Sequence, residues 1–239
     1  MRQATVTIIL VLGVLLMGLD IVSLQRNARA RDQGMKPTPD TMMQRSTTPT
    51  DPAQAGEIAL QAKQFQSAVD LFTRALENET DPSRQASLLI SRGDAHVALG
   101  QSEAALEDYD ASLTIEPDQP LRLIRRALLY RVHDQPEKAL ADLDHVLEID
   151  PTNINAHYAR GAVLYGLEKF AEAEQTFSDC IALDPSLATA YFNRAHARMR
   201  MGSREKACAD LEKFISLSND ASATQQARDL LKTWKSETP

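Results

Sequence analysis

The sequence predicts an all-α protein made of helical hairpins that repeat along the chain and end in a capping helix. The main observation is a period of 34 residues, the length of two short helices with their turns. Each period also contains two stretches with the apolar spacing of an amphipathic helix. The composition agrees, because aromatic residues make up 5% of the 239 residues and glycines number nine, which disfavours an all-β sandwich.

Four columns of residues keep this interval over most of the chain. The first consists of prolines that each follow an acidic residue: Pro117, Pro151 and Pro185. The others hold a small residue, an arginine and a bulky residue: Ala105, Ala139, Ala173 and Ala207; Arg92, Arg126, Arg160 and Arg194; Tyr109, Leu143, Phe177 and Leu211. Agreement of four independent columns indicates repeated copies of one structural unit.

The second unit illustrates how the columns relate to structure. Residues 84–99 and 102–115 are expected to form its two helices, separated by a short turn. Ala105 lies where the two helices cross closely, and Tyr109 lies one turn further along the same face. Pro117 ends the second helix, because proline lacks the backbone N–H that a continuing helix requires, and begins the turn into the next unit.

These patterns resemble the tetratricopeptide repeat (TPR) family, whose helix-turn-helix unit has this length. The fourth unit is the best copy, with Gly161, Ala173, Phe177 and Pro185 at the family positions. The resemblance implies a right-handed α-solenoid of five units with a capping helix. The units are 49–85, 86–119, 120–153, 154–187 and 188–221, followed by a cap and tail at 222–239, in which the helix runs from Ala223 to Trp234.

Two units depart from the family pattern. The first unit matches only if three additional residues are placed around 81–83. In the fifth unit, Asn219 stands where the pattern has proline.

An apolar segment precedes the repeats. Residues 4–24 comprise 21 residues with Asp20 as their only charge. At about 1.5 Å per residue, such a helix is about 31 Å long and can cross a bilayer. Residues 1–30 are therefore predicted to be a transmembrane anchor or a signal peptide, with a possible cleavage site after Ala30. We favour the uncleaved anchor because the apolar run is long.

The charges around this segment leave its orientation open. Four cations follow it, which by the positive-inside rule would keep the repeats in the cytoplasm. A short basic tip before an apolar run is, however, the ordinary export signal. We expect the repeats to lie outside the cytoplasm, periplasmic or held at the cell membrane. Residues 31–48, rich in proline and threonine, are expected to be an extended spacer.

The TPR family binds its partners on the concave face, which the first helices of successive units line. The resemblance implies a peptide-binding groove formed by Ile90, Asp94, Leu121, Ile124, Leu128, Arg131, Tyr158, Tyr165, Phe192, His196, Met199 and Arg200. Val132 and Thr189 occupy family positions of the same kind. Because many of these residues are apolar, either a partner segment covers them or some of them belong to the core.

Some members of the family bind chaperone C-terminal tails through a clamp of lysine and asparagine. Asn193 matches one of the asparagines, but Ser87 and Ile90 stand where cations are needed. The groove is therefore expected to take an apolar or amphipathic peptide or helix, with Arg131 and Arg200 attracting acidic groups.

Several other classes of function have no support in the sequence. A net charge of -7 argues against nucleic acid as the partner. The five histidines lack metal-ligand spacing, and the two cysteines are expected to be buried free thiols. Because no catalytic or phosphate-binding motif is found, we predict no catalytic residues, no metal and no cofactor. The arginine column is interpreted as structural, pairing with Asp108, Asp142 and Asp210.

The sequence thus predicts a non-catalytic scaffold that binds a peptide or helix of another protein at the cell envelope. One alternative is a structural module that associates with itself into a homo-oligomer. An accessory domain of an envelope enzyme complex is a further alternative, which no residue favours.

Overall fold

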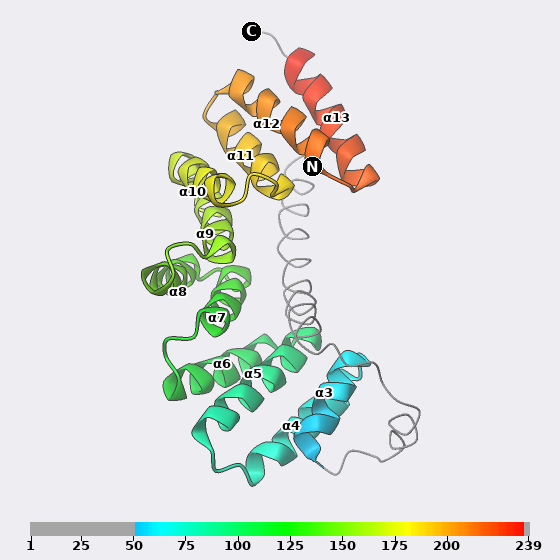
Figure 1. The fold of residues 1–239 in the computed structure, drawn as a ribbon, viewed down its shortest axis with the longest axis vertical. Coiled ribbons are helices and arrows are strands. Elements are labelled where there is room, and N and C mark those ends of the chain that lie inside the picture. Colours follow the sequence, from blue (N-terminus) through cyan, green and yellow to red (C-terminus); the bar gives the residue numbers. More distant parts are fainter. Residues whose placement is uncertain (1–50, 237–239) are drawn as a thin grey trace, which may run out of the picture. The chain divides into compact units, whose positions relative to one another are not determined.

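The computed structural model describes residues 51–236. These residues form eleven α-helices and no strand, which confirms the predicted all-α class (Figure 1). No helix in this part of the chain is long and apolar enough to cross a bilayer. The anchor predicted at 4–24 and the spacer predicted at 31–48 lie outside the described residues.

Ten of these helices form five helix-turn-helix pairs, and the last helix follows alone (Figure 1). The pairs are α3 (Pro52–Gln61) with α4 (Phe65–Glu77), α5 (Pro82–Ala98) with α6 (Ser102–Ile115), α7 (Pro120–Val132) with α8 (Pro136–Ile149), α9 (Ile154–Gly166) with α10 (Phe170–Leu183), and α11 (Ala188–Arg200) with α12 (Arg204–Leu217). The final helix is α13 (Ala221–Ser236).

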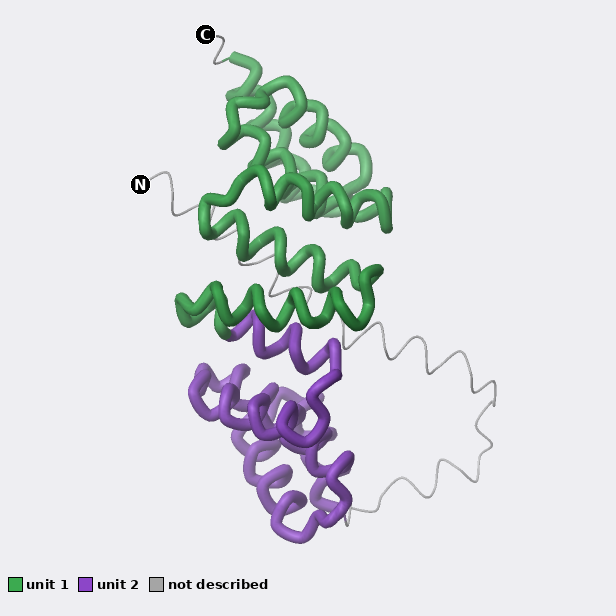
Figure 2. The backbone as a smooth tube through the Cα atoms, turned by 90° about the vertical axis from the view of Figure 1, so that its left-hand side faces the viewer, with its two compact units in different colours: residues 1–17, 130–239 green, residues 18–129 purple. Residues whose placement is uncertain are grey.

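The described chain forms two compact units, 51–129 and 130–236, and the boundary between them falls within α7 (Figure 2). In the first unit, α5 packs against both α4 and α6. In the second unit, α9 packs against α8 and α10, α11 packs against α10 and α12, and α13 packs against α12. Each of these first helices therefore contacts the second helix before it and the second helix after it.

The corners between pairs are formed alike. The corner prolines lie two residues after the ends of α6, α8 and α10: Pro117, Pro151 and Pro185. At two of these corners an aspartate precedes the proline and accepts a backbone hydrogen bond, Asp150 from Thr152 at 3.0 Å and Asp184 from Ser186 at 2.8 Å. These hydrogen bonds, with those from the neighbouring hydroxyls, lower the pKa of both carboxyls. The predicted equivalence of the three corners is confirmed.

The turn within each pair contains one residue in the left-handed backbone conformation. The residues occupy equivalent places, with φ between 54° and 78°: Lys63, Gly100, Asp134, Glu168 and Gly202. Glycine adopts this conformation freely, whereas other residues lose about 1–2 kcal/mol in it. The turn geometry is therefore imposed on the two units that carry Lys63 and Glu168, whereas aspartate tolerates it at position 134.

Close approach of the two helices in a pair explains why the bulky residue of the second helix faces a small residue of the first helix. A Cβ atom on Gly161 would lie only 2.7 Å from the Phe177 ring. Two other pairs show the same arrangement: Gly56 with Phe72 at 2.7 Å and Gly93 with Tyr109 at 2.5 Å. In the fifth pair the first helix carries Ala195, and the residue in the place of the ring is the smaller Leu211, in the same core. The volume of the small residue in the first helix thus compensates for that of the bulky residue in the second helix.

The three additional residues of the first unit lie in a helix rather than in a loop. The repeat period would start α5 at residue 86, but it starts at Pro82. Proline suits this first helical position, since its missing N–H has no intrahelical acceptor there. The structure agrees with the expected position around 81–83, because Pro82 and Ser83 lie in the N-terminal extension of α5.

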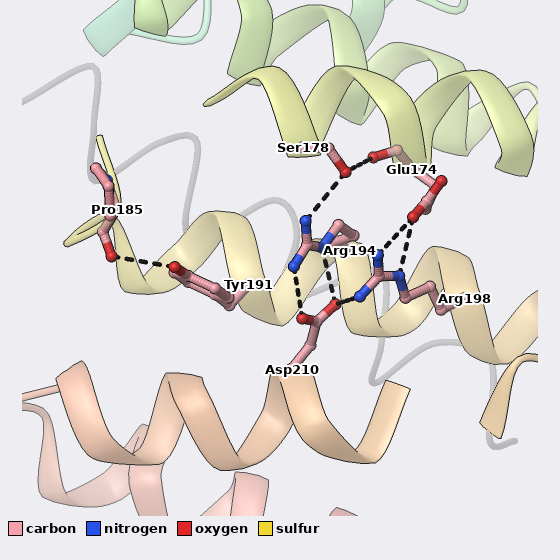
Figure 3. Close-up of polar contacts among 7 residues, drawn as sticks. All are labelled: Glu174, Ser178, Pro185, Tyr191, Arg194, Arg198 and Asp210. Atoms are coloured by element: carbon pink, nitrogen blue, oxygen red, sulfur yellow. Dashed lines mark hydrogen bonds and ion pairs between the residues drawn. The ribbon is translucent and has the colours of Figure 1, made fainter. Parts of the chain in front are cut away.

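The arginine column connects helices, as Figure 3 shows for Arg194. Arg194 donates to Asp210 at 2.7 and 2.9 Å and to Ser178 at 3.0 Å. Arg198 donates to Asp210 at 2.8 Å and to Glu174 at 2.7 and 3.0 Å. Both carboxylates therefore have guanidinium partners, and the network joins α10, α11 and α12.

The other arginines of the column also pair with carboxylates. Their partners lie 16 residues away in sequence: Arg92 with Asp108, Arg126 with Asp110 and Arg160 with Asp144. The predicted pairing with Asp108 and Asp210 is confirmed. The structural interpretation of this column therefore holds, and these residues form no free cationic ladder.

Candidate functional site

Five of the predicted groove residues lie in the unit 51–129: Ile90, Asp94, Leu121, Ile124 and Leu128. Ile90 and Ile124 are only 8% and 4% exposed, so they belong to the interior. Leu121 and Leu128 are half-buried. Asp94 forms an ion pair with Arg125 and accepts a hydrogen bond from the Tyr109 hydroxyl at 2.7 Å. The charge of this surface is therefore balanced within the unit.

This unit also contains a shallow cavity of about 360 Å³ between α3 and α5. Its polar lining is largely bonded internally. Arg84 pairs with Asp51 at 3.0 Å, and Ser91 donates to Glu57 at 2.7 Å. The cavity is therefore a weaker candidate than the surface of the second unit.

The other seven predicted residues lie in the unit 130–236. Arg200 is exposed, and four of the residues are half-buried: Arg131, Tyr165, Phe192 and Met199. Tyr158 and His196 are buried, with exposed fractions of 3% and 7%. Tyr158 and His196 are therefore core residues, as are Ile90 and Ile124 in the first unit.

Aromatic and cationic side chains meet near the turn between α9 and α10. The rings of Tyr165 and Phe170 are 5.3 Å apart in an edge-to-face arrangement. The Arg200 guanidinium lies 4.3 Å from the Phe170 ring centre and 3.4 Å from Glu168. Burial raises the pKa of the Tyr165 hydroxyl, which stays protonated. A planar cation over half-buried rings suits contact with an aromatic or apolar group.

Two apolar side chains of the same unit face solvent. Val132, at the end of α7, is 62% exposed, and Met201, after α11, is 39% exposed. We use the name first-helix face for the surface residues at the ends of the first helices in this unit and in the turns that follow them, with Phe170 at the start of α10: Arg131, Val132, Tyr165, Phe170, Met199, Arg200 and Met201. This face combines apolar, aromatic and cationic groups.

A polar cluster lies beside this face. Asn193 donates a hydrogen bond of 2.6 Å to the Tyr158 hydroxyl, and both residues are 3% exposed. The Thr189 hydroxyl also lies next to the Tyr158 hydroxyl and interacts with it. Arg131 is close enough to Tyr158 to interact with it electrostatically. Burial raises the pKa of Tyr158 and lowers that of Arg131.

Aromatic and imidazole rings pack together at the end of the repeats next to α13. The ring of His196 is 4.7 Å from that of Phe192 and 5.4 Å from that of Trp234 in α13. Burial lowers the pKa of His196 to about 4, so the imidazole is neutral at pH 7. Trp234 is itself 7% exposed. The capping helix therefore covers His196, and Phe192 packs against His196 and against Phe214 of α12.

Phe170, Met201 and Trp234 were not among the predicted groove residues. Phe170 begins α10, Met201 follows α11, and Trp234 lies in α13, so none occupies a groove position of a first helix. Their size beside a turn is the only signal that the sequence offers for Phe170 and Met201.

The described chain shows little that suggests catalysis. Across residues 51–236, no three His, Cys, Asp or Glu side chains gather as a metal site. Cys180 and Cys208 are buried free thiols, as predicted. Burial raises the pKa of Cys180 to about 12, so this thiol is protonated and unreactive at neutral pH.

Comparison with known families supports the repeat. A family model described as tetratricopeptide repeat matches residues 54–120. A second model with the same description matches residues 154–187 and 188–220.

Similar proteins include the mitochondrial import receptor subunit TOM70 of Homo sapiens and the Hsp70-Hsp90 organizing protein of Triticum aestivum. The first is 29% identical over 149 residues, which cover 59% of this chain and 24% of the relative. The second is 24% identical over 203 residues, which cover 69% of this chain and 34% of the relative. The chain thus spans a quarter to a third of these relatives.

Similar solved structures include that of MamA and that of YrrB, described as a TPR protein with an unusual peptide-binding site. MamA aligns with a TM-score of 0.62 and 16% identity, over 79% of this chain and 94% of the other. YrrB aligns with a TM-score of 0.62 and 19% identity, over 80% of this chain and 96% of the other. At these identities the likeness concerns the fold.

Proposed function

Because this chain belongs to the tetratricopeptide repeat family, we propose that it is a non-catalytic module whose first-helix face binds an apolar or aromatic segment of a partner protein. The exposed apolar surface carries the proposal. Val132 and Met201 are 62% and 39% exposed, close to the ends of first helices that also carry the half-buried Tyr165. Apolar groups that gather on one face in water favour contact with a partner.

The descriptions of similar proteins support a peptide or helix as the ligand class. YrrB is described as having a peptide-binding site, and TOM70 is named as a receptor subunit. Those roles belong to those proteins. For this chain, the proposed ligand is an extended or helical segment with apolar side chains at regular spacing.

We propose this class rather than a chaperone C-terminal tail. Asn193, which matches the family's clamp, already donates to Tyr158 and is 3% exposed. In the first unit, Ile90 is buried where a cation would be needed. The positions that match the clamp therefore supply neither a free amide nor a cation.

We further propose that the module works at the cell envelope, with its repeats outside the cytoplasm. The 21 residues 4–24, with one charge, support a membrane anchor that would raise the local concentration of the module near its partner. Fusion of alkaline phosphatase after residue 50 tests the location. An active phosphatase is expected, and an inactive one would place the repeats in the cytoplasm.

The binding proposal is tested with the full-length chain in detergent and a random peptide library displayed on phage. We expect selection of peptides rich in apolar and aromatic residues. The affinity of one synthetic selected peptide is then measured for the Val132→Ser/Met201→Ser variant. Since each buried apolar side chain contributes about 1.5–3 kcal/mol, the affinity should fall at least about tenfold for each side chain that the peptide covers.

A matched control uses two equally exposed apolar residues at the ends of second helices. Ile149 and Leu183 are 40% and 39% exposed, so the Ile149→Ser/Leu183→Ser variant changes similar surface elsewhere. It should bind as the parent does. Equal loss in both variants, or no selected peptide, would contradict the proposal. Light scattering that shows a mass rising with concentration, abolished by Val132→Ser/Met201→Ser, would favour self-association on this face instead.

A further inference from the structure

We propose that Arg131 is the receptor for one acidic side chain, an aspartate or glutamate, of the segment that binds the first-helix face. This inference rests on the proposed function and names the charged group that the ligand must carry. It identifies a specific anchor inside an otherwise apolar and aromatic surface.

Arg131 differs from the other arginines packed against helices. Arg125, Arg160, Arg194 and Arg198 each have a carboxylate partner. Arg131 has no ion pair or hydrogen bond to any residue of 51–236, and its Nε atom is buried without an acceptor. A half-buried guanidinium has lost part of its hydration, so the charged side chain of Arg131 is destabilised in the absence of a bound anion.

The neighbour with which Arg131 interacts is a hydrogen-bond donor, the Tyr158 hydroxyl. The Tyr158 hydroxyl, which interacts electrostatically with Arg131, accepts from Asn193 at 2.6 Å, so its own proton is available. The Thr189 hydroxyl lies beside the Tyr158 hydroxyl and interacts with it. A guanidinium and a neighbouring phenol with an unused donor form an arrangement that a carboxylate satisfies. The Asn193 amide fixes the orientation of the phenol.

The charge of this cluster indicates the charge of the ligand group. Arg131 is the charged member of the cluster that it forms with Tyr158 and Asn193, so the cluster complements one negative charge, which a side-chain carboxylate carries. A phosphate group would bring nearly two charges to a single partner. A carboxylate is also planar and matches the fork of a guanidinium, so it recovers two parallel hydrogen bonds. We therefore assign an internal aspartate or glutamate of the partner segment to this position.

The first test needs no ligand and uses the sign of a stability change. Arg131→Met keeps the aliphatic stem and removes a charge that has no partner, so the thermal midpoint of the full-length chain should stay unchanged or rise. Arg194→Met is the matched control, because Arg194 lies in the same unit with its charge paired to Asp210 at 2.7 Å, and its midpoint should fall clearly. A comparable fall for Arg131→Met would show that Arg131 is structural and would overturn the inference.

The second test identifies the ligand group with the random peptide library displayed on phage. Selection on the parent chain should enrich Asp or Glu at one fixed position between apolar residues. Selection on Arg131→Met should keep the apolar pattern and lose the acid, and Arg131→Lys should retain a weaker preference. A synthetic peptide in which this acid is changed to its amide should bind the parent about ten- to hundredfold more weakly and should bind Arg131→Met no differently.

The outcomes separate this inference from the proposed function. Enrichment of apolar peptides without a fixed acid, or with an acid that Arg131→Met also selects, overturns the role of Arg131 and leaves the peptide-binding function standing. Enrichment of nothing overturns both. A peptide whose affinity depends on its free C-terminal carboxylate, and is lost on amidation of that end, shows that Arg131 reads a chain terminus and overturns the assignment of an internal side chain.

Discussion

The volume compensation between Gly161 and Phe177 makes a quantitative prediction. In Gly161→Ala the new Cβ would lie 2.7, 2.9 and 3.0 Å from three atoms of the Phe177 ring, whereas carbon atoms normally approach to about 3.5–4.0 Å. Phe177 has no exposed surface, and its ring is 5.9 Å from that of Tyr158, so it has little room to move. The methyl group must therefore push the helices apart.

The magnitude follows from two opposing effects. Overpacking of a core costs about 1–3 kcal/mol, and a buried aromatic ring places this site in the upper part of that range. Alanine in place of glycine within a helix returns about 1 kcal/mol. Gly161→Ala should therefore lower the free energy of unfolding by about 1–2 kcal/mol, measured as a lower urea midpoint by far-UV circular dichroism.

Two further variants make this reasoning refutable. The double variant Gly161→Ala/Phe177→Leu recreates the combination of Ala195 and Leu211. Its loss in the free energy of unfolding should be smaller than the sum of the losses in the two single variants. Gly166→Ala in the same helix is the control, because no atom lies within 4 Å of its added Cβ, and it should be neutral or slightly stabilising. A Gly161→Ala protein as stable as the parent, with no coupling to Phe177→Leu, would refute the argument.

Three other predictions follow from the turn, the core histidine and a buried thiol. Lys63 has φ of 59°, so Lys63→Gly should raise the free energy of unfolding by up to about 1 kcal/mol, measured by urea unfolding; a lower midpoint would contradict this. Burial lowers the pKa of His196 to about 4 from about 6.5, so the folded state resists its protonation. The contribution of His196 to the free energy of unfolding should be constant above about pH 6.5 and should fall by about 3 kcal/mol in total towards pH 4. Thermal melts of His196→Phe over the same pH range should show a smaller decline than those of the parent, and identical declines would refute the prediction. Because burial raises the pKa of Cys180 to about 12, a thiol reagent at neutral pH should leave Cys180 unmodified until the chain is unfolded, and rapid native modification on peptide mapping would disagree.

The repeat architecture was predictable because it depends on short-range chemistry. Proline cannot continue a helix, as at Pro117, and an acidic residue followed by proline recurs with the 34-residue period. The equivalence of these corners could therefore be predicted from the sequence. Pro82 illustrates the limit of this rule. Proline also starts helices, and only the structure shows that α5 begins there.

The binding surface was less predictable because burial depends on residues far away in sequence. Tyr158 occupies a groove position, yet Phe177 and Asn193 contact it from other helices. His196 is covered by Trp234 of the cap. That Arg131 has no hydrogen-bond partner for its Nε atom among residues 51–236 is likewise a property of three-dimensional packing, which a position in a repeat does not report.

The most direct measurement is photocrosslinking of the selected peptide to the full-length chain. A photoreactive phenylalanine derivative is placed at Val132 on the first-helix face, or at Ile149 at the end of a second helix, both of which are exposed. The crosslinked peptide is then mapped by mass spectrometry. Efficient crosslinking from Val132 and little from Ile149 is the expected result. Crosslinking mainly from Ile149, or equally from both, would contradict binding on the first-helix face.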